Sequence, residues 1–344
     1  MSKNIWRFRN GAIHVALLFL LGSVTVNAVG ARYVTVATIG NLPHIKKYES
    51  PQDLLTQIKN FWLVELKQVT PYKPDIILLP EECDFPSEGL SKKEKDNYLE
   101  LRKNQMLDFF ASIAKNNHCY IAFGMKRLAD DGTWRNSSIL LDREGKIAGI
   151  YDKNYPTISE LTSGIKAGND VPVFQCDFGR VAMVICFDLN FDELRQKYVK
   201  SQPDLILFSS MYHGGDALQS SWAYSCRSFF VSATGFRNIP AEIRNPLGQI
   251  VNSNTNYYDF AVSKINLDYE LVHLDYNWDK LRALKEKYKD EVSIIDPGKL
   301  GAVLITSDDK NISAKDMTDE FKIELLDDYF NQSRNARLKS IKSK

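Results

Sequence analysis

The amino-acid sequence predicts an α/β (α+β) protein in which helices cover a mixed sheet. Short, continuously apolar runs such as Asp75–Leu79 and Val181–Cys186 are typical of strands buried on both faces. Longer segments such as Pro51–Val69 carry apolar residues at helical spacing. A hairpin pattern is the third observation, since Trp134–Asp142 and Lys146–Lys153 flank a turn. Because crossovers and hairpins both occur, the sheet should contain parallel and antiparallel strands.

In the N-terminal half, β-rich runs alternate with helical patterns. Tyr33–Ile39 predicts a strand, and Pro51–Val69 predicts a helix because apolar residues recur three and four positions apart. The pattern of Lys92–Asn117 predicts one long helix that ends at two asparagines, and Tyr120–Gly124 predicts the strand that follows it. The buried run Asp75–Leu79 and the two hairpin arms complete this half.

In the C-terminal half, the buried-strand pattern recurs before the composition changes. The expected strands are Val181–Cys186, Asp204–Ser209, Phe229–Thr234 and Ala261–Asn266, and the expected helices are Asp192–Lys200 and Ala217–Ser228. After Leu267 the chain is more charged, with two polar-rich helix candidates at Asp279–Lys289 and Asp319–Asn331 and a frayed end from Ser333. Residues 268–344 lack a sizeable apolar set, so they are interpreted as a C-terminal extension of a domain spanning 32–267.

Composition limits the classes of partner. The 344 residues include 44 Lys and Arg against 43 Asp and Glu, a formal charge of +1. This balance argues against nucleic acid as a partner, since such proteins normally carry a basic excess. Apolar residues at 44% and charged residues at 25% exclude long disorder and a small disulfide-stapled scaffold. The expected partner is a small molecule or another protein.

The first 31 residues have the layout of a secretory signal peptide. Three basic residues precede the apolar run Ala12–Val26, and small residues follow it at Ala28 and Ala31. The run is too short and too interrupted for a secure membrane span. Cleavage would begin the mature chain at Val29 or Arg32, with no stable span remaining, and would export the protein to the periplasm or medium. An uncleaved N-terminal anchor is the alternative.

Cysteine and histidine usage gives no support for a metal site. The five cysteines form no C-x-x-C pair, and the five histidines are scattered. Because the cysteine number is odd, at least one is unpaired within the chain. Cys119 and Cys176 lie in apolar runs where a free thiol is expected, and pairing among the others stays open.

Three reactive side chains stand at the ends of apolar runs. Glu81 follows Pro80, which ends its strand, while Lys153 and Cys186 end two others. Carboxyl ends of strands are where open α/β sheets place ligands. A cysteine can act as a nucleophile, a desolvated carboxylate as its base and a fixed ammonium as the oxyanion partner. These groups suffice for acyl transfer without a metal or cofactor.

The stretches that carry these residues resemble the motifs of a known family. In order they read LLPEECDF, GIYDKNYP and VAMVICFDLNF, and they are similar to the three motifs of the nitrilase (carbon–nitrogen hydrolase) superfamily. The resemblance covers about residues 33–267. It implies a four-layer α-β-β-α sandwich, a homodimer or higher homo-oligomer, and no cofactor.

The resemblance also implies roles for individual residues. Glu81 matches the general base, Lys153 the oxyanion-stabilising lysine and Cys186 the nucleophile, while Glu160 matches a second glutamate that positions substrate and lysine. The N–H of Phe187 would be the second oxyanion donor. Glu82 is the alternative candidate for the role of general base. Tyr212 and His213, in the loop after a strand, could contact substrate, and a purely structural role for His213 is the alternative.

The implied activity is hydrolysis of a linear, non-peptide amide. N-carbamoyl hydrolysis and acyl transfer are alternatives within the superfamily, and a secreted binding protein on the same scaffold is a third. A papain-like hydrolase would instead need His213 or His273 beside Cys186. Phe187-Asp188 after the nucleophile differs from the Trp-Glu usual in true nitrilases, and the Asp188 carboxylate is expected to orient backbone. Asn136 begins an N-x-S sequon that is interpreted as a chance match.

Overall fold

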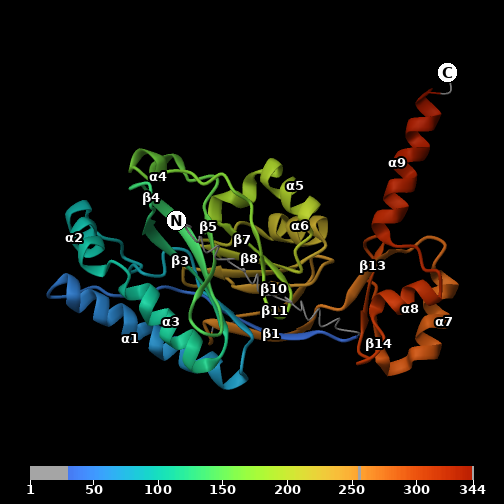
Figure 1. The fold of residues 1–344 in the computed structure, drawn as a ribbon, viewed down its shortest axis with the longest axis horizontal. Helices are drawn as coiled ribbons and strands as arrows, with labels where there is room; N and C mark the ends of the chain where they lie inside the picture. Colours follow the sequence, from blue (N-terminus) through green and yellow to red (C-terminus); the bar gives the residue numbers. More distant parts are fainter. Residues whose placement is uncertain (1–29, 255–256, 343–344) are drawn as a thin grey trace, which may run out of the picture.

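Two six-stranded sheets packed face to face form the centre of the molecule (Figure 1). The computed structural model describes residues 30–254 and 257–342, so the predicted signal peptide lies outside the described residues except for Gly30 and Ala31. One sheet has the order β12 (Phe260–Asn266), β1 (Tyr33–Ile39), β2 (Ile76–Leu78), β3 (Tyr120–Leu128), β4 (Trp134–Leu141) and β5 (Ile147–Asp152). The other has the order β11 (Ile250–Ser253), β10 (Glu242–Arg244), β9 (Phe229–Thr234), β8 (Leu205–Ser210), β7 (Arg180–Ile185) and β6 (Val173–Gln175).

Each sheet combines a parallel centre with antiparallel edges. β1, β2 and β3 are parallel neighbours, as are β7, β8 and β9, whereas β4, β5 and β12 pair antiparallel in the first sheet. The parallel strands are buried on both faces, which explains their continuously apolar runs. The predicted mixed sheet is confirmed, although it is split into two.

Helices cover the outer face of each sheet. The first sheet carries α1 (Pro51–Val69), α2 (Lys92–Arg102) and α3 (Gln105–Asn117), and the second carries α5 (Asp192–Ser201) and α6 (Asp216–Cys226). Short 3₁₀ turns occur at Thr70–Tyr72, Cys186–Asn190 and Lys289–Glu291. A separate apolar cluster fills each of the three interfaces, with Trp62, Met183 and Trp222 as examples. The four-layer α-β-β-α sandwich is therefore confirmed.

The long helix predicted at Lys92–Asn117 is two helices. Lys103 adopts a left-handed conformation, with φ of 41°, and ends α2. The Arg102 side chain turns inward there, where it donates to the Lys126 carbonyl and pairs with Asp84 at 3.1 Å. This buried ion pair fixes a break that the helical pattern alone does not reveal.

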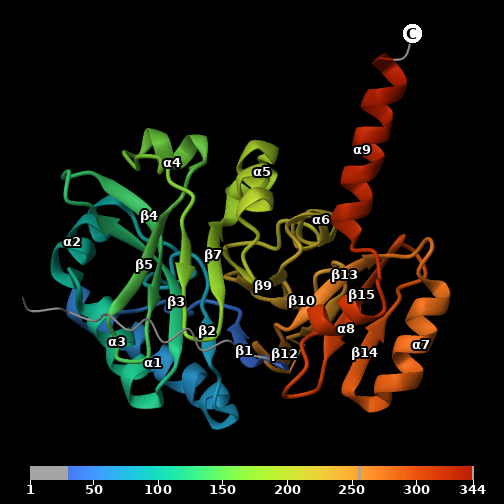
Figure 2. The ribbon, with the colours of Figure 1, turned by 45° about the vertical axis from the view of Figure 1, so that its right-hand side comes forward.

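The C-terminal segment contains a sheet of its own, which corrects the expectation of a segment without an apolar core. β13 (Tyr269–His273), β15 (Ala302–Ser307) and β14 (Val292–Ile295) pair in that order, with α7 (Trp278–Tyr288) and α8 (Ala314–Glu320) against them (Figure 2). Fully buried residues include Val272, Leu284, Val303, Ile305 and Met317. The boundary after residue 267 stays a prediction.

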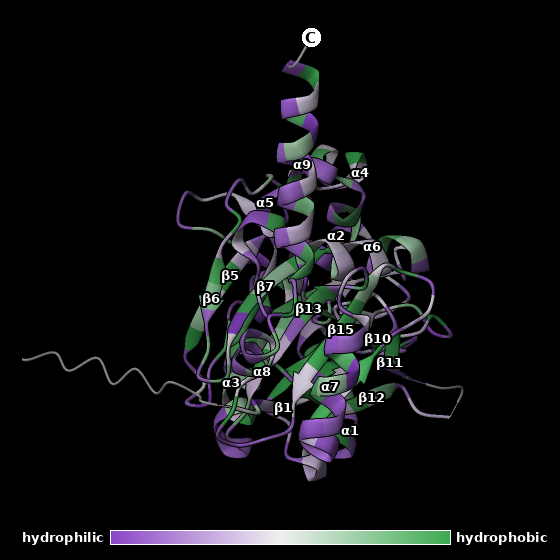
Figure 3. Ribbon diagram, turned by 90° about the vertical axis from the view of Figure 1, so that its right-hand side faces the viewer, coloured by the Kyte–Doolittle hydropathy of each residue, from purple (hydrophilic) through white to green (hydrophobic). Residues whose placement is uncertain are grey.

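The last helix differs from its prediction in place and extent. Asp319–Asn331 is not one helix, because Lys322 is left-handed and Leu325 bridges to β13. α9 (Leu326–Lys342) then runs through the region expected to fray, so that expectation is wrong for residues 333–342. The helix projects from the body and is largely hydrophilic (Figures 2 and 3). Among the residues the structure describes, no helix is long and apolar enough to cross a membrane.

Candidate active site

The two sheets bring Glu81, Lys153 and Cys186 to one buried site. Glu81 follows β2, Lys153 follows β5, and Cys186 follows β7 of the second sheet. Their exposed fractions are 3%, 2% and 8%. Gly124 lets the Glu81 segment lie against β3, because a Cβ at Gly124 would stand 2.6 Å from the Glu81 Cα. The three predicted side chains therefore come together although 105 positions separate the first from the last.

Lys153 forms an ion pair with each of two glutamates. Its Nζ lies 2.8 Å from Glu81 Oε1 and 2.9 Å from Glu160 Oε2. Glu160 lies on the short helix α4 (Ile158–Thr162), where a capping box with Thr157 fixes both its backbone and its carboxylate. Lys153 therefore lies between the carboxylates of Glu81 and Glu160, the two glutamates that the family resemblance assigns to the site.

Asn136 is a site residue that the sequence interpretation missed. Its Nδ2 donates to Glu81 Oε1 and to Glu160 Oε1, both at 2.7 Å, and the residue is only 1% exposed. The amide therefore holds two like-charged carboxylates in fixed positions around Lys153. The local sequence gives no signal for this role, because the neighbours Arg135, Ser137 and Ser138 are also polar.

The backbone at Cys186 is strained and held by Asp188. Cys186 has φ of 45°, a left-handed conformation that costs a non-glycine residue about 1–3 kcal/mol. The Asp188 carboxylate accepts from the Ile185 N–H at 3.0 Å, the Tyr155 N–H at 2.8 Å and the Tyr151 hydroxyl at 2.7 Å. The prediction that Asp188 orients backbone is confirmed.

Burial determines the resting protonation of the thiol and the base. Burial, with a smaller effect from Glu81, raises the pKa of Cys186 to about 12, against the attraction of Lys153. The hydroxyl of Ser210 and the Glu81 carboxylate are hydrogen-bonding neighbours of this thiol. Burial also raises the pKa of Glu81, which Lys153 opposes. The resting cysteine is therefore a thiol near neutral pH, and the raised pKa of Glu81 increases the affinity of its carboxylate for the thiol proton.

The pKa shifts of Lys153 and Glu160 favour a permanent ion pair between these two side chains. Burial would lower the pKa of Lys153, but Glu81, Cys186 and Glu160 together raise it. Burial would raise the pKa of Glu160, but Lys153 and Asn136 lower it. The two glutamates thus differ: Glu81 is the carboxyl whose proton affinity is raised, whereas Glu160 stays ionised beside the lysine.

Neither alternative partner for the cysteine is supported by the geometry. Glu82 turns away, with its carboxylate 3.0 Å from Lys126 Nζ, so Glu81 is the glutamate at the site. His213 Nε2 lies 2.9 Å from Glu242 Oε2, and His273 at the end of β13 stacks on Tyr329 of α9. The groups acting on the Cys186 thiol are carboxylate, ammonium and hydroxyl groups, which disfavours a papain-like pair.

The loop after β8 reaches the site through its backbone. The Met211 N–H donates to Glu81 Oε2 at 3.1 Å. Tyr212 is 41% exposed, and His213 is held by Glu242. Phe187 packs edge-on against Phe191, with ring centroids 5.3 Å apart. Substrate contact by Tyr212, His213 and Phe187 stays a prediction.

All five cysteines are free and buried. The prediction that Cys119 and Cys176 are free thiols is confirmed. Cys83 and Cys226, whose pairing the sequence left open, form no disulfide either. Within residues 30–254 and 257–342, no group of three His, Cys, Asp or Glu side chains could hold a metal ion.

Comparison with known sequences identifies relatives across the sandwich. The family described as "Carbon-nitrogen hydrolase" matches residues 30–258. Deaminated glutathione amidase from Dictyostelium discoideum is 25% identical over 235 residues, covering 59% of this chain and 80% of that protein. Pantetheinase from Mus musculus is 23% identical over 182 residues, covering 52% of this chain but only 34% of its own length.

Solved structures share the fold at low identity. An amidase from Nesterenkonia sp. has a TM-score of 0.58 at 14% identity, covering 75% of this chain and 97% of its own. The Caenorhabditis elegans NitFhit protein has a TM-score of 0.59 at 14% identity, covering 85% and 98%. The family match spans more than half of the chain and includes every strand end that supplies the site. From these matches we conclude that this chain belongs to the carbon–nitrogen hydrolase, or nitrilase, superfamily.

Proposed function

We propose that the protein hydrolyses a linear, non-peptide amide through a thioester on Cys186. The observation that carries the proposal is one buried ammonium, Lys153, that contacts Glu81 and lies near enough to Cys186 to influence its thiol. Glu81 acts as the base and Lys153 as the oxyanion partner. Glu160 positions the Lys153 ammonium, and Asn136 positions the Glu81 carboxylate. The names of relatives, an amidase and a pantetheinase among them, support an amide as the substrate.

The first half of the reaction forms the acyl-enzyme. Glu81 takes the thiol proton as the Cys186 sulfur bonds to the carbonyl carbon, and the carbonyl electron pair moves to oxygen. Lys153 Nζ and the Phe187 N–H stabilise that oxyanion. When the carbonyl reforms, the carbon–nitrogen bond breaks, and Glu81 gives its proton to the departing amine.

The second half regenerates the enzyme. Glu81 takes a proton from water, and the hydroxide attacks the thioester carbonyl. Collapse of this second tetrahedral intermediate releases the carboxylic acid, and the proton on Glu81 returns to the Cys186 sulfur. An amine in place of water would give acyl transfer, and a carbamoyl group would give carbamate. Release of ammonia or amine from a panel of amides, N-carbamoyl compounds and nitriles separates these outcomes from a protein that only binds.

The proposal predicts a preference for amides over nitriles. A nitrile first gives a thioimidate whose nitrogen must be protonated and hydrated. Asp188, the nearest acid after Cys186, is occupied by Tyr151, Ile185 and Tyr155 and is not free to assist. The expected result is a higher kcat/KM for an aliphatic amide than for its matched nitrile. A nitrile preference of about tenfold, or ~1.4 kcal/mol of transition-state stabilisation, would contradict the assignment.

We also propose that the protein is exported after removal of its N-terminal segment. The Ala31 N–H donates to the Asp309 carbonyl at 2.7 Å, and Gly30 lies so close to Lys310 that a Cβ would clash. Cleavage after Ala28 keeps both contacts, so Val29 is favoured over Arg32 as the mature start. N-terminal sequencing of the recovered protein tests this, and an intact Met1 in the membrane fraction would indicate the anchor instead. Homo-oligomeric assembly stays a prediction from the family resemblance.

A further inference from the structure

Ser210 stands beside the candidate nucleophile at the edge of the second sheet. The strands β7 and β8 are parallel neighbours, and their register pairs Ile185 with Ser209. Cys186 and Ser210 come next on the two strands, so strand pairing brings them together where the polar side chains of the site begin. Ser210 thus owes its place beside Cys186 to the sheet itself.

The Ser210 hydroxyl is buried and has a proton to donate. The residue is 0% exposed, and its oxygen accepts from the Tyr212 N–H at 3.2 Å. A hydroxyl that accepts from an amide still has its own proton for a second partner. The Cys186 sulfur is a hydrogen-bonding neighbour of this hydroxyl. The adjacent Ser209 differs, because its hydroxyl donates to the Leu79 carbonyl at 2.9 Å.

The charge balance at the sulfur favours such a donor. The Nζ atom of Lys153 lies 2.8 Å from the carboxylate of Glu81 and 2.9 Å from that of Glu160. When Glu81 takes the thiol proton, the sulfur replaces it as an anion, so one ammonium faces two anions before and after the transfer. Burial raises the pKa of the Cys186 thiol, whereas Lys153 and the Ser210 hydroxyl lower it. A hydrogen bond to an ionised acceptor is about twice as strong as one between neutral groups.

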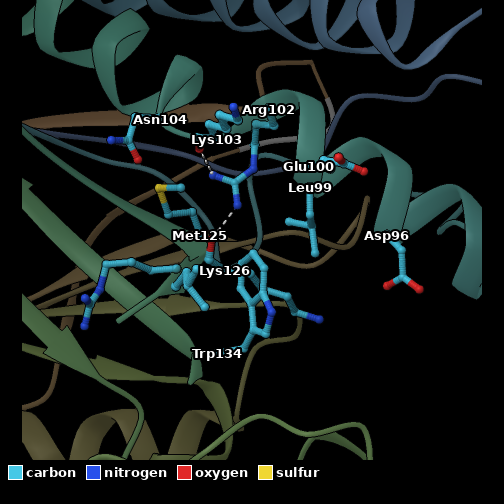
Figure 4. Close-up of a pocket in the computed structure, with 11 residues that line it drawn as sticks. Asp96, Leu99, Glu100, Arg102, Lys103, Asn104, Met125, Lys126 and Trp134 are labelled. Carbon is cyan, nitrogen blue, oxygen red and sulfur yellow. Dashed lines mark hydrogen bonds between the residues drawn. The ribbon is translucent and has the colours of Figure 1, made fainter. Parts of the chain in front are cut away.

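Two basic side chains near the segment after β2 are paired with other carboxylates. Lys126 Nζ lies 3.0 Å from the carboxylate of Glu82, and Arg102 lies 3.1 Å from Asp84. Both line a cavity of about 580 Å³ between α2 and the ends of β3 and β4, where Arg102 donates to the Lys126 carbonyl (Figure 4). Their charges are therefore compensated locally and are not available to the Cys186 sulfur.

We propose that Ser210 is a further catalytic residue, whose hydroxyl donates to the Cys186 sulfur and stabilises the thiolate as Glu81 removes the proton. The inference rests on the proposed function. In acylation the thiol proton moves to Glu81, a sulfur electron pair bonds to the carbonyl carbon, and Ser210 keeps its own proton. When the thioester breaks, the sulfur leaves with the bonding electron pair, and the same hydroxyl stabilises it until Glu81 returns the proton.

Alkylation of Cys186 by iodoacetamide tests this contact without any amide. Ser210→Ala should lower the rate by about threefold or more, because a higher thiol pKa reduces the thiolate fraction more than it increases the nucleophilicity of the thiolate. The pH at which the rate rises with ionisation of Glu81 should stay unchanged, since the hydroxyl contacts the sulfur. A merely structural disturbance would instead release the Met211 N–H from Glu81 and move this rise to higher pH, because a hydrogen bond to a carboxylate lowers its pKa.

Ser232→Ala is the matched control. Ser232 on β9 is also 0% exposed, and its oxygen accepts from the Glu242 N–H at 2.9 Å, so this substitution removes the same kind of buried contact. It should leave the alkylation rate of Cys186 and kcat/KM close to wild type. Ser210→Ala should lower kcat/KM for the best amide by about tenfold, the size expected for losing a hydrogen bond to a charged group.

A second pair of variants covers the case in which Ser210→Ala does not fold. Ser210→Thr and Ser210→Val introduce side chains of nearly the same shape, of which only threonine has a hydroxyl. Alkylation should be at least about threefold faster in Ser210→Thr than in Ser210→Val.

The outcomes distinguish this inference from the proposed function. A wild-type alkylation rate in Ser210→Ala, or equal rates in Ser210→Thr and Ser210→Val, would overturn the role of Ser210 and leave hydrolysis intact. If wild-type protein hydrolyses no amide but alkylation still depends on the hydroxyl, the hydrolase proposal fails and the contact with the thiolate stands.

Discussion

Replacement of Cys186 by alanine is expected to remove turnover, with a loss above about 10³-fold, the scale for a covalent nucleophile that works together with its base and oxyanion donors. In the part of the chain that the structure describes, the hydrogen-bond partners of Glu81 are Lys153, Asn136 and the Met211 N–H, and none of these is a thiol that could replace Cys186. The fold should persist, since Asp188 holds the turn through groups that the substitution leaves in place. The measurement is kcat/KM for the best amide, with thermal unfolding as the check on folding.

A second cysteine provides the matched control for that result. Cys226 is fully buried on the outer side of the second sheet, in the cluster with Trp222. Cys226→Ala should lower stability through a small cavity and leave kcat/KM within about threefold of wild type. If Cys186→Ala retains more than a tenth of the activity, the nucleophile assignment is wrong.

Replacement of Glu81 by glutamine is expected to lower kcat by about 10² to 10⁴-fold, the range for loss of a general base. Glutamine keeps an oxygen for the Met211 N–H but cannot carry the thiol proton. The matched control is Glu82→Gln at the adjacent position, which pairs with Lys126 and should retain most activity toward an uncharged amide. The opposite ranking would transfer the base role to Glu82.

The pH dependence of thiol alkylation gives an independent measure of the same role. Glu81 accepts the Cys186 proton only when ionised, so iodoacetamide should react faster as pH rises through the pKa of Glu81. Burial raises that pKa above the ordinary glutamate value. The rise in alkylation rate, which is the limb of the pH profile that Glu81 controls, should therefore lie at a higher pH than the usual carboxylate range. In Glu81→Gln the limb should vanish, and reaction should rise only as the thiol itself ionises at alkaline pH. An unchanged limb would exclude Glu81 as its origin.

The sequence allowed the strands and the three reactive residues to be predicted because their signals are local. A buried parallel strand must be apolar at every position, so Val181–Ile185 stands out, and the polar residue that follows it marks the sheet edge. Residues 302–306 carry the same apolar signal, but the charged residues on both sides of β15 make the composition of the whole segment polar and hide it. The division into two sheets depends on pairings such as β1 with β12, whose residues are more than 220 positions apart.

The parts of the site that could not be predicted depend on contacts from distant segments. Asn136 stands in an ordinary N-x-S sequon. Its role follows from the carboxylates of Glu160, on α4, and Glu81, after β2, which the fold brings to its amide. Lys103 favours helix by propensity, yet it is left-handed because the preceding Arg102 is drawn inward by Asp84. Neither arrangement has a pattern in the local sequence.

Four of the free cysteines lie in different layers of the molecule, so the reactivity of each thiol can report on the opening of its own layer. Cys83 and Cys119 lie between helices and the first sheet, Cys176 lies between the two sheets, and Cys226 lies between the second sheet and its helices. A buried thiol reacts with a labelling reagent only when its surroundings open, so its labelling rate measures the free energy of that local opening. The order in which these four residues become labelled would therefore show which interface of the sandwich separates first, without any engineered probe.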